Sequence, residues 1–482
     1  MIDNGVYKIT FTNQGGSVKS WLLTDKKYRG NDGKPLDLVN PNAPERPFSL
    51  YFPGQKPTAD VNWTWYRQTG DPDDLGVTYE YSDGRTAVRK VFKFTPKSYR
   101  SEITTDVAIN GQPVTHMVTW RGGFGDLTVV NPANSQQTLY YNTADNKLVK
   151  QNARAAQKAG QPILAGGAFS FAGIEDTYFG AVFLPKGDAP IQQLTFADSV
   201  PPPADKNPLT FAGVGVSDGA TNHFDLFVGP KDVDLLKRVN PRLEQVVDFG
   251  WFGVLAKPLF LVVNYFNDAF VHNFGWSIVV VTIIINIALL PLKLSNMKSM
   301  RKMQALKPQI DAINDKYKNL KLTDPRKADQ QQEVMDLYKK NGVNPMGGCF
   351  PMLLQLPFFF AFYKVFTVSV EMRGASWLWV GDLSQPEHLP IKILPIVLIA
   401  SQFLMQKMTP QAAGTDPNQQ KMMMFMPLIF GFMFYNFPSG LVLYYLTSNL
   451  VGMAQQWFFN HTDAAQAAAR SVQPPKKKNG RK

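Results

Sequence analysis

Residues 270–292 read FVHNFGWSIVVVTIIINIALLPL, an apolar run without a charged side chain. A helix of this length can cross a hydrocarbon core of roughly 30 Å. The run 422–436 would extend only about 22 Å as a helix, so a buried or re-entrant segment is the alternative there. The pattern predicts an α-helical membrane bundle within residues 269–460. Its five expected spans are residues 270–292, 350–371, 391–408, 422–436 and 439–459.

The segments that join these runs differ in basic charge. Residues 293–348 hold 12 Lys and Arg, residues 372–390 hold Arg373 alone, and the tail 461–482 holds six. Because cytoplasmic loops are enriched in Lys and Arg, we expect the first loop and the tail inside and residues 1–240 outside. A domain of that size needs a signal or an anchor to cross, so we also expect a membrane helix ahead of residue 1.

The first 240 residues differ from the rest in composition. They carry 25 Lys and Arg against 24 Asp and Glu, whereas residues 241–482 carry 25 against 14. Residues of one face recur at every second position in the runs 88–94, 103–109 and 224–228, and Lys90 falls on the otherwise apolar face of the first run. Turn signals such as Asn-Gly separate these runs. The pattern predicts an extracytoplasmic antiparallel β-sandwich (supersandwich) over residues 1–240.

Aromatic side chains cluster in the first third of this domain. They could line a sugar or peptide cleft, or they could be ordinary core and edge residues of the sandwich. The residues are Trp63, Trp65, Tyr66, Tyr79 and Tyr81.

Residues 241–268 link the two halves. The stretch is apolar, but Gly250, Gly253 and Pro258 interrupt it. Trp251 lies close to the charged residue Asp248, which favours an amphipathic helix in the membrane interface. A sixth span is the competing interpretation.

The basic loop has helical periodicity. Asp324 and Pro325 are suited to begin a second helix, as a cap and a first-turn residue. The sequence therefore predicts a cytoplasmic helical hairpin over residues 294–342, either as a structural element or as a docking surface for ribosomes, targeting factors or nascent chains. The expected apolar seam consists of Met303, Leu306, Ile310, Ile313, Tyr317 and Leu320 on the first helix and Ala328, Gln331, Met335 and Tyr338 on the second.

Sequence motifs exclude several classes of function. The single cysteine, Cys349, cannot form a disulfide within the chain, and the five histidines form no metal-binding pair. There is no GxSxG, P-loop or GxGxxG motif. We therefore expect neither an enzyme nor a bound cofactor or metal.

Polar residues recur inside the apolar runs. Thr282 and Asn286 are four residues apart and so lie on one helix face, as do Tyr445 and Asn449. Such residues often form hydrogen bonds between membrane helices, but this many could instead line a shared hydrated recess. The candidates for that recess are Thr282, Asn286, Gln355, Tyr363, Lys364, Thr367, Ser401, Gln402, Tyr444, Tyr445, Ser448 and Asn449.

Lys364 is the charged member of that set. A lysine at the centre of a membrane helix costs roughly 2.5–3.5 kcal/mol on insertion scales. Its side chain could extend to the outer face of the membrane, or it could supply a positive charge to the recess. The sequence leaves both interpretations open.

Two motifs resemble a known family. Residues 344–357, NPMGGCFPMLLQLP, and residues 437–449, FPSGLVLYYLTSN, are similar to the starts of two membrane helices in the YidC/Oxa/Alb family of membrane protein insertases. Residues 246–251 resemble the exit from the periplasmic domain of its bacterial members. The similarity covers about 245–460, whereas residues 1–240 match in position and β character.

The resemblance implies a function and a set of partners. Family members insert and fold membrane proteins in the bacterial inner membrane through a polar groove open to the cytoplasm and the inner leaflet. Implied partners are nascent membrane proteins, the Sec translocon, the ribosome (through the cytoplasmic loops and basic tail) and membrane lipids, with the monomer as the working unit. Two groove residues of the family fall on Thr282 and Tyr445. Bacterial members usually have an Arg where this chain has Asn286.

Two other functions remain as alternatives. A solute transporter or channel with a periplasmic binding domain would favour internal repeats and polarity through every span, and neither pattern is present. A membrane-anchored carbohydrate-binding protein would carry its function in residues 1–240.

Overall fold

The computed structural model describes residues 1–30, 32–70, 75–129, 131–187, 190–201, 208–318, 320, 324–343, 350–409 and 417–462. They form two compact units, each described by itself below. The first consists of Met1–Asp248 with Val368–Glu371, and the second of Phe249–Thr367 with Met372 onward. The basic tail from residue 463 and the first six residues of the 344–357 motif lie outside the described residues.

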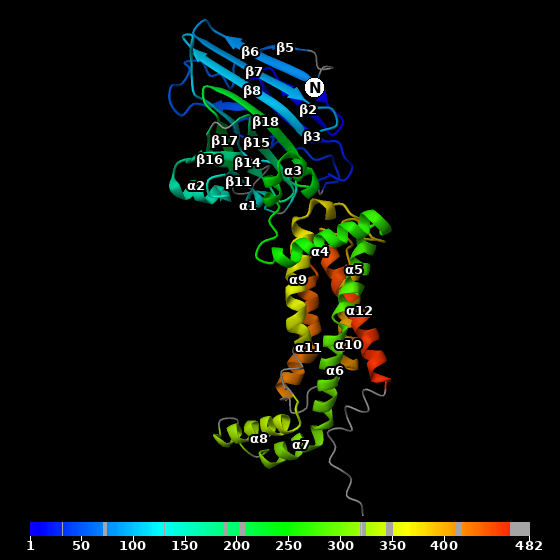
Figure 1. The fold of residues 1–482 in the computed structure, drawn as a ribbon. Coiled ribbons are helices and arrows are strands. Elements are labelled where there is room, and N and C mark those ends of the chain that lie inside the picture. The colour runs from blue at the N-terminus through cyan, green and yellow to red at the C-terminus, as the bar shows by residue number, and fades with distance from the viewer. Residues whose placement is uncertain are drawn as a thin grey trace, which may run out of the picture. The chain divides into compact units, whose positions relative to one another are not determined.

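The strands of the first unit pair antiparallel in three sheets (Figure 1). The small sheet contains β1 (Ile2–Asp3), β2 (Tyr7–Thr12) and β3 (Ser17–Leu23). The five-stranded sheet has the order β13 (Ile163–Gly167), β16 (Ile191–Val200), β17 (Leu209–Ser217), β10 (Met117–Trp120) and β4 (Ser49–Tyr51).

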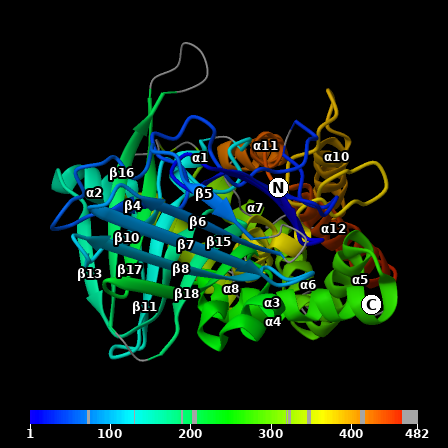
Figure 2. The same cartoon turned by 90° about the horizontal axis from the view of Figure 1, so that it is seen from above.

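The largest sheet has ten strands, several of which run side by side in Figure 2. Its order is β12 (Lys147–Asn152), β11 (Gln137–Asn142), β14 (Phe169–Glu175), β15 (Phe179–Pro185), β18 (Thr221–Pro230), β8 (Arg100–Ile109), β7 (Thr86–Phe94), β6 (Gly76–Ser82) and β5 (Arg67–Thr69), with β9 (Gln112–Pro113) paired to β8. Three short helices accompany the sheets: α1 (Pro132–Ser135), α2 (Ala153–Ala159) and α3 (Val233–Val239).

The period of two in the sequence becomes the inner and outer face of each strand. In β7 the side chains of Val88, Lys90, Phe92 and Phe94 are buried, and β8 alternates in the same way. Asn110 and the glycine after it both have positive φ, at 52° and 75°, as a tight hairpin turn between β8 and β9 requires. The structure thus confirms an antiparallel β domain followed by a helical region.

Lys90 is fully buried on the apolar face. Its ammonium donates hydrogen bonds to the backbone oxygens of Gly15, at 2.6 Å, and Phe48, at 2.7 Å. It also lies 5.6 Å from the centre of the Tyr66 ring. The side chain therefore connects three segments of the core, and the sequence pattern had placed it on the correct face.

The aromatic residues proposed for a cleft are divided between the core and the surface. Tyr66 and Tyr79 belong to the main hydrophobic core. Trp65 is 73% exposed, and Trp63 has Arg46 above its ring. These positions favour the interpretation as core and edge residues.

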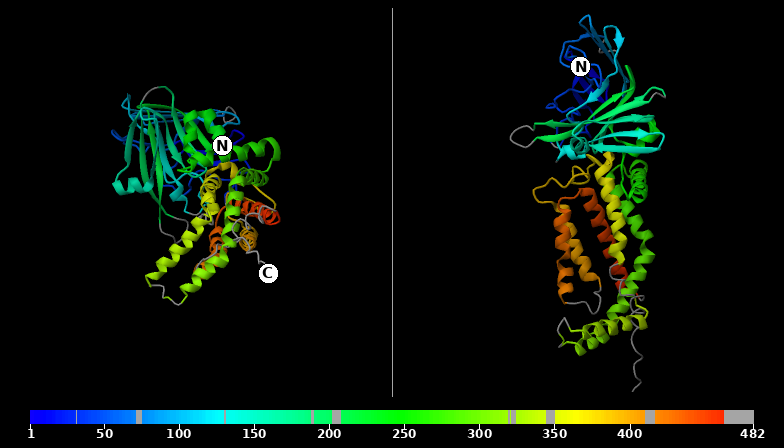
Figure 3. Two further views of the ribbon diagram at one scale, coloured as in Figure 1. Left: turned by 60° about the horizontal axis from the view of Figure 1, so that its bottom comes forward. Right: turned by 90° about the vertical axis from the view of Figure 1, so that its left-hand side faces the viewer.

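The second unit is helical, and its long helices run beside one another (Figures 1 and 3). Its helices are α4 (Gly253–Phe266, extended by a π turn, Asn267–Val271), α5 (Phe274–Ala288), α6 (Leu290–Ala305), α7 (Lys307–Lys316), α8 (Arg326–Lys340), α9 (Phe350–Val368), α10 (Ile393–Met408), α11 (Pro417–Phe434) and α12 (Ser439–Asn460).

Helix lengths bear on the expected spans without fixing their number. By length and apolar content, the described helix Gly253–Val271 could cross a membrane, and α5 and α6 form a pair bent by 59° that could cross as one broken span. Shorter apolar stretches lie in α9, α10 and α11. Helix α11 has 18 residues because it begins at Pro417, ahead of the apolar run at 422.

The hairpin segment differs in detail from its prediction. Met303, Leu306, Ile310 and Tyr338 are buried together, as expected. Ala328, Gln331 and Met335, however, are exposed, so their places in the predicted seam are wrong. The second helix instead turns Val334 and Leu337 toward the cluster. Two polar contacts also join the helices near the end of α7. These contacts are Asn314–Gln330 and Tyr317–Glu333.

Candidate functional site

The polar face of α5 begins the site. Thr282 and Asn286 are buried, with exposed fractions of 0% and 3%. The Thr282 hydroxyl donates to the backbone oxygen of Ile278, and the Asn286 side-chain nitrogen donates to the backbone oxygen of Thr282 at 2.8 Å. Such bonds satisfy polar groups within their own helix. The Asn286 side-chain oxygen remains free to accept a bond from elsewhere.

Helix α12 approaches Asn286 from across the bundle. The Ser448 hydroxyl lies 3.4 Å from the Asn286 side-chain nitrogen, and Gln455 donates to the Asn286 backbone oxygen at 3.3 Å. These distances are at the long end for hydrogen bonds, so the contacts are weaker than those within α5. They tie α5 to α12 without using all of the polar capacity of either helix.

A lysine from the next helix completes this cluster. The Lys293 ammonium in α6 donates a hydrogen bond to the Asn286 side-chain oxygen. Lys293 is seven residues beyond Asn286, which is close to two helical turns, and side chains tilt toward the helix N-terminus. The positive charge therefore reaches back to the side-chain oxygen of Asn286.

These groups adjoin a cavity of about 320 Å³. Its walls come from α6, α9, α10 and α12, and they are mainly polar uncharged side chains and methionines. Its lining residues are Lys293, Asn296, Met297, Met300, Gln355, Met405, Thr409, Tyr445, Ser448, Asn449, Gly452, Gln455 and Gln456. Four of the residues predicted for the recess, Gln355, Tyr445, Ser448 and Asn449, are thus together at one cavity.

Other predicted residues support the walls of this cavity. Tyr444 is buried and accepts a hydrogen bond from Gln355 at 2.6 Å. Asn449 donates to the Ser401 hydroxyl at 3.2 Å. Gln402 carries a buried side-chain oxygen without a partner in the described part of the chain.

Three predicted residues of α9 lie elsewhere. The Thr367 hydroxyl donates to the backbone oxygen of Tyr363, and the Tyr363 ring packs against Phe437. The Lys364 side chain runs beside Gly250: a Cβ placed on that glycine would lie 3.6 Å from the Lys364 ammonium. The structure does not bring any of these three side chains to the cavity.

The sequence did not single out Gly452, Gln455 and Gln456 of α12 or the lining residues of α6. Tyr445, Asn449, Gly452 and Gln456 recur at spacings of 4, 3 and 4, so one face of α12 could have been followed to its end. Lys293 gave no comparable signal, because it is one of the 12 Lys and Arg residues of the segment 293–348.

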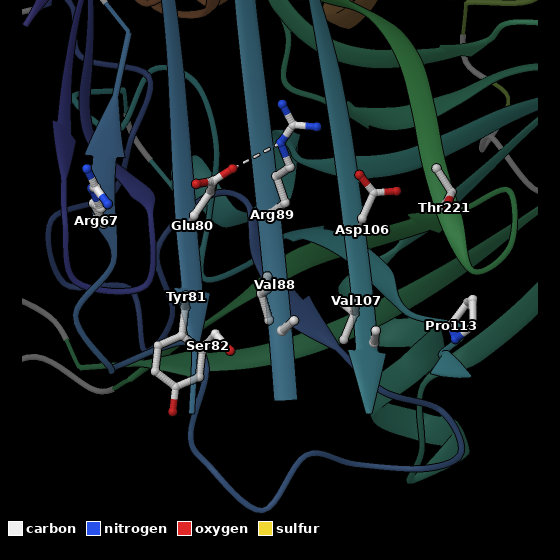
Figure 4. A pocket seen from close by; sticks show the side chains of 12 residues that line it. Arg67, Glu80, Tyr81, Ser82, Val88, Arg89, Asp106, Val107, Pro113 and Thr221 are labelled. Atoms are coloured by element: carbon white, nitrogen blue, oxygen red, sulfur yellow. Dashed lines mark ion pairs between the residues drawn. The ribbon is translucent and has the colours of Figure 1, made fainter. Parts of the chain in front are cut away.

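A second cavity, of about 540 Å³, lies on the solvent-facing side of β6, β7 and β8 (Figure 4). Arg67, Glu80, Arg89 and Asp106 stand opposite one another on successive strands, so their charges alternate. Glu80 and Arg89 form an ion pair at 3.3 Å. The row largely compensates its own charge, which is typical of a solvated sheet face.

Comparison with known proteins gives the family. The model of the YidC periplasmic domain matches residues 1–262, and that of the 60Kd inner membrane protein matches residues 265–466. A protein of Geobacter sp. (strain M21) named membrane protein insertase YidC is 33% identical over 96% of this chain and 85% of its own length. Its namesake in Syntrophus aciditrophicus (strain SB) is 34% identical over 95% of this chain and 84% of its own length. The chain belongs to the YidC family of membrane protein insertases.

Membership of the YidC family confirms several predictions. The chain is an inner-membrane protein with a periplasmic domain, as the loop charges predicted. The family is one of insertases and not of enzymes, in agreement with the motif analysis.

A solved structure described as an active YidC insertase with its first transmembrane domain resolved has 21% identity and a TM-score of 0.42, and the alignment covers 95% of this chain and 92% of that one.

Proposed function

We propose that this chain inserts membrane proteins by receiving the polar flank of an apolar segment in the cavity between α6, α9, α10 and α12. An unpaired polar group in hydrocarbon is costly, so a wet recess lowers the barrier for a short hydrophilic terminus to cross. The apolar segment can then move into lipid along the outside of the helices. No nucleotide is needed, since the partition of the apolar segment into lipid drives the step.

The composition of the cavity wall carries this proposal. Gln355, Tyr445, Ser448 and Asn449 offer amide and hydroxyl groups that can bond a polypeptide backbone. Met297, Met300 and Met405 lie among them, and flexible methionine side chains suit partners of varied shape. This mixture fits a passing polypeptide better than a fixed small solute.

The aromatic packing of α9 disfavours a channel. Tyr444 stacks on Phe362 at 4.2 Å between ring centres, and Phe362 stacks in turn on Phe366 at 5.9 Å. These rings lie directly beyond the Gln355–Tyr444 hydrogen bond. A solute pathway would need polar groups to continue past this point, whereas a recess that takes one end of a polypeptide does not.

The surface of α11 provides a route into lipid. Its exposed side chains are large and apolar, and Phe432 is 83% exposed. An apolar segment that leaves the recess would lie against such a face without losing its hydrophobic surroundings. We assign the same lipid-facing role to Met422, Met424, Phe425, Leu428, Ile429 and Met433.

The arrangement in the membrane extends the proposal. We assign five spans within residues 269–460, with residues 1–240 as the periplasmic domain and 294–342 as the cytoplasmic hairpin. The segment 241–268 lies in the interface. This position suits the exposed side chains of Trp251, just before α4, and Val254, within α4. The tail 461–482 lies in the cytoplasm.

The proposed partners follow from this arrangement. Nascent membrane proteins are the substrates, and a monomer is the working unit, alone or with the Sec translocon. The basic hairpin and the tail would contact the ribosome and anionic lipid by charge.

Reconstitution tests the function directly. Proteoliposomes that contain only this chain are expected to insert a small phage-coat-type protein, measured by protection of its inserted segment from external protease. Empty liposomes and liposomes with an unrelated helical membrane protein are the controls. Protection no greater than in these controls would refute the proposed function.

A further inference from the structure

Another cavity, of about 540 Å³, lies within the first unit beside α3. Its walls come from the segment after β3, the turn between β7 and β8, the end of β18 and α3. Its volume is within the range of roughly 300–1,000 Å³ that is typical of small-molecule sites. Its lining residues are Asp25, Tyr28, Lys97, Ser98, Tyr99, Arg100, Pro230, Asp232, Leu235, Arg238 and Val239.

The cavity holds charges of both signs that do not pair with each other. In the described part of the chain, the side chains of Lys97 and Arg238 have neither an ion-pair nor a hydrogen-bond partner. The carboxylates of Asp25 and Asp232 each accept one backbone N–H. Opposite charges that face one cavity without contact can be joined by a ligand that carries both charges.

A buried tyrosine in the cavity wall also lacks a partner. Tyr28 is 7% exposed, and its ring packs edge-on against Phe179 at 5.5 Å between ring centres. Its hydroxyl has no hydrogen-bond partner among the described residues. A buried hydroxyl usually has a partner, because an unsatisfied one costs free energy. The wall is therefore built for a polar ligand.

A second tyrosine of the wall is a hydrogen-bond donor at neutral pH. Burial, and then the carboxylates of Asp25 and Asp232, raise the pKa of Tyr99 to about 12. Its hydroxyl therefore keeps its proton and can donate to an anionic group.

The position of α3 in the chain indicates what can reach this cavity. Val233, the first residue of α3, donates its backbone N–H to the Glu371 carboxylate at 3.4 Å. Glu371 follows Val368, the last residue of α9, by three positions, and all three residues belong to the first unit. Three residues of chain extend at most about 10 Å. Since α9 crosses the membrane in the arrangement proposed above, α3 lies close to the outer membrane surface.

We propose that this cavity binds the headgroup of a zwitterionic phospholipid with a primary ammonium, such as phosphatidylethanolamine, from the outer leaflet. Lys97 and Arg238 hold the phosphate, and Asp25 and Asp232 hold the ammonium beside the tyrosine rings. The proposal goes beyond the insertase function and rests on the membrane arrangement given above. The bound lipid ties the periplasmic domain to the membrane surface.

The acceptors of the cavity suit a primary ammonium. Such a group has three N–H donors, which match the Asp25 and Asp232 carboxylates and the Tyr28 hydroxyl. A choline group has no N–H donor, and a glycerol headgroup has no positive charge. The site should therefore distinguish phospholipids by their headgroups.

The cavity also has an apolar side, which suits a lipid rather than a soluble zwitterion. Leu235 and Val239 are four residues apart on α3 and so lie on one face, and Pro230 lines the same cavity. Glycerol and acyl chains follow the headgroup of a lipid and gain from apolar surface. Free phosphoethanolamine has no such part.

The test titrates the full chain in detergent with short-chain phospholipids that share the same acyl chains, and native mass spectrometry counts the bound lipid. Phosphatidylethanolamine should bind more tightly than phosphatidylcholine or phosphatidylglycerol. Asp25→Asn keeps an acceptor for the Lys27 N–H but removes the charge, so it should weaken the tightest phosphatidylethanolamine site roughly tenfold. It should not weaken the binding of phosphatidylglycerol, which has no ammonium.

A second variant tests the phosphate side. Arg238→Gln should weaken phosphatidylethanolamine and phosphatidylglycerol alike, because both carry the phosphate. Asp234→Asn, which changes an exposed carboxylate of α3 outside the cavity, is the matched control and should bind as the wild type does. Thermal unfolding of each purified variant checks that it is folded.

The proposal is overturned if Asp25→Asn and Arg238→Gln bind phosphatidylethanolamine as tightly as Asp234→Asn does, or if phosphatidylcholine binds the wild type equally well. It is also overturned if free phosphoethanolamine displaces the lipid at equal concentration, because the cavity would then take a soluble zwitterion. Insertion by the reconstituted chain is a separate measurement, so either failure can be recognised without the other.

Discussion

The two units of this chain bury polar groups in opposite ways. In the β domain, Glu175 is fully buried and meets the ammonium groups of Lys150 at 2.8 Å and Lys231 at 2.9 Å. In the helical unit, Asn286 meets Ser448 and Gln455 at 3.3–3.5 Å, and Lys293 has no acidic partner among the residues of its cavity. The first arrangement is closed, while the second leaves hydrogen-bonding capacity beside an open space.

The difference distinguishes polar groups that stabilise the fold from polar groups that are available to bind a ligand. A buried charge that loses its partner is severely destabilising, so paired charges such as Glu175 hold segments in place. Lys150, for example, also donates to the Val246 backbone oxygen and so fastens the end of the β domain. Groups that are only partly satisfied hold the fold less firmly, but they are ready to bind a ligand. Substitutions in the two units should therefore change different measurements.

The largest effect is expected at the closed cluster. Glu175→Gln removes the carboxylate that pairs with the buried Lys231 and the half-buried Lys150, and the free energy of unfolding should fall by about 3–5 kcal/mol. Chemical unfolding of the full chain in detergent, followed by tryptophan fluorescence, measures this change. A loss below 1 kcal/mol would show that the two lysines do not depend on the Glu175 carboxylate as their counter-charge.

A second large effect concerns pH. Burial lowers the pKa of Lys90 from its usual value of 10.5 to about 7. The folded chain therefore releases this proton near pH 7 and the unfolded chain only near 10.5, so unfolding takes up a proton between these values. Stability should rise with pH across this window, by an amount on the order of a few kcal/mol.

Lys90→Met should remove that rise in stability between pH 7 and 10, whatever its effect on stability at any one pH. Lys93→Met, at an exposed position of the same strand, should retain the rise. Denaturant midpoints measured at several pH values give the comparison. Equal slopes in the two variants would contradict a buried, uncharged Lys90 above pH 7.

Residues that line the cavity should contact the substrate directly. Photocrosslinkers in place of Tyr445 and Asn449 should capture a nascent membrane protein several-fold more than one at Leu450, which is on the same helix but 50% exposed on another face. Gel analysis of the crosslinked products measures the yields. Equal capture at all three positions would mean that the polar groups only hold the helices together.

The smallest effect is expected on the exposed row of charges. Glu80→Gln breaks the surface pair with Arg89 and should change the free energy of unfolding by less than about 1 kcal/mol, because solvent screens both charges. The same unfolding experiment used for Glu175→Gln supplies the value. A loss as large as at Glu175 would erase the contrast between paired surface charges and paired buried ones.

Much of the fold could be predicted from local patterns. The period of two identified strands such as β7 and put Lys90 on its buried face, because strand geometry alone decides which side chains share a face. Apolar runs located α9, α10 and α12 within a few residues. The period of the hairpin was less informative, since a seam is set by both helices and Met335 turned out to be exposed.

The sequence by itself thus determined the two-part organisation, the character of each part and, through two motifs, the family. The tertiary structure alone decided which polar residues meet. Lys364 lies within an apolar run and Lys293 directly follows one. The side chain of Lys364 nevertheless lies beside Gly250, whereas that of Lys293 reaches Asn286. The physical reason is that a bend of 59° and the packing of α12 set these contacts, and neither is encoded in the spacing along one helix.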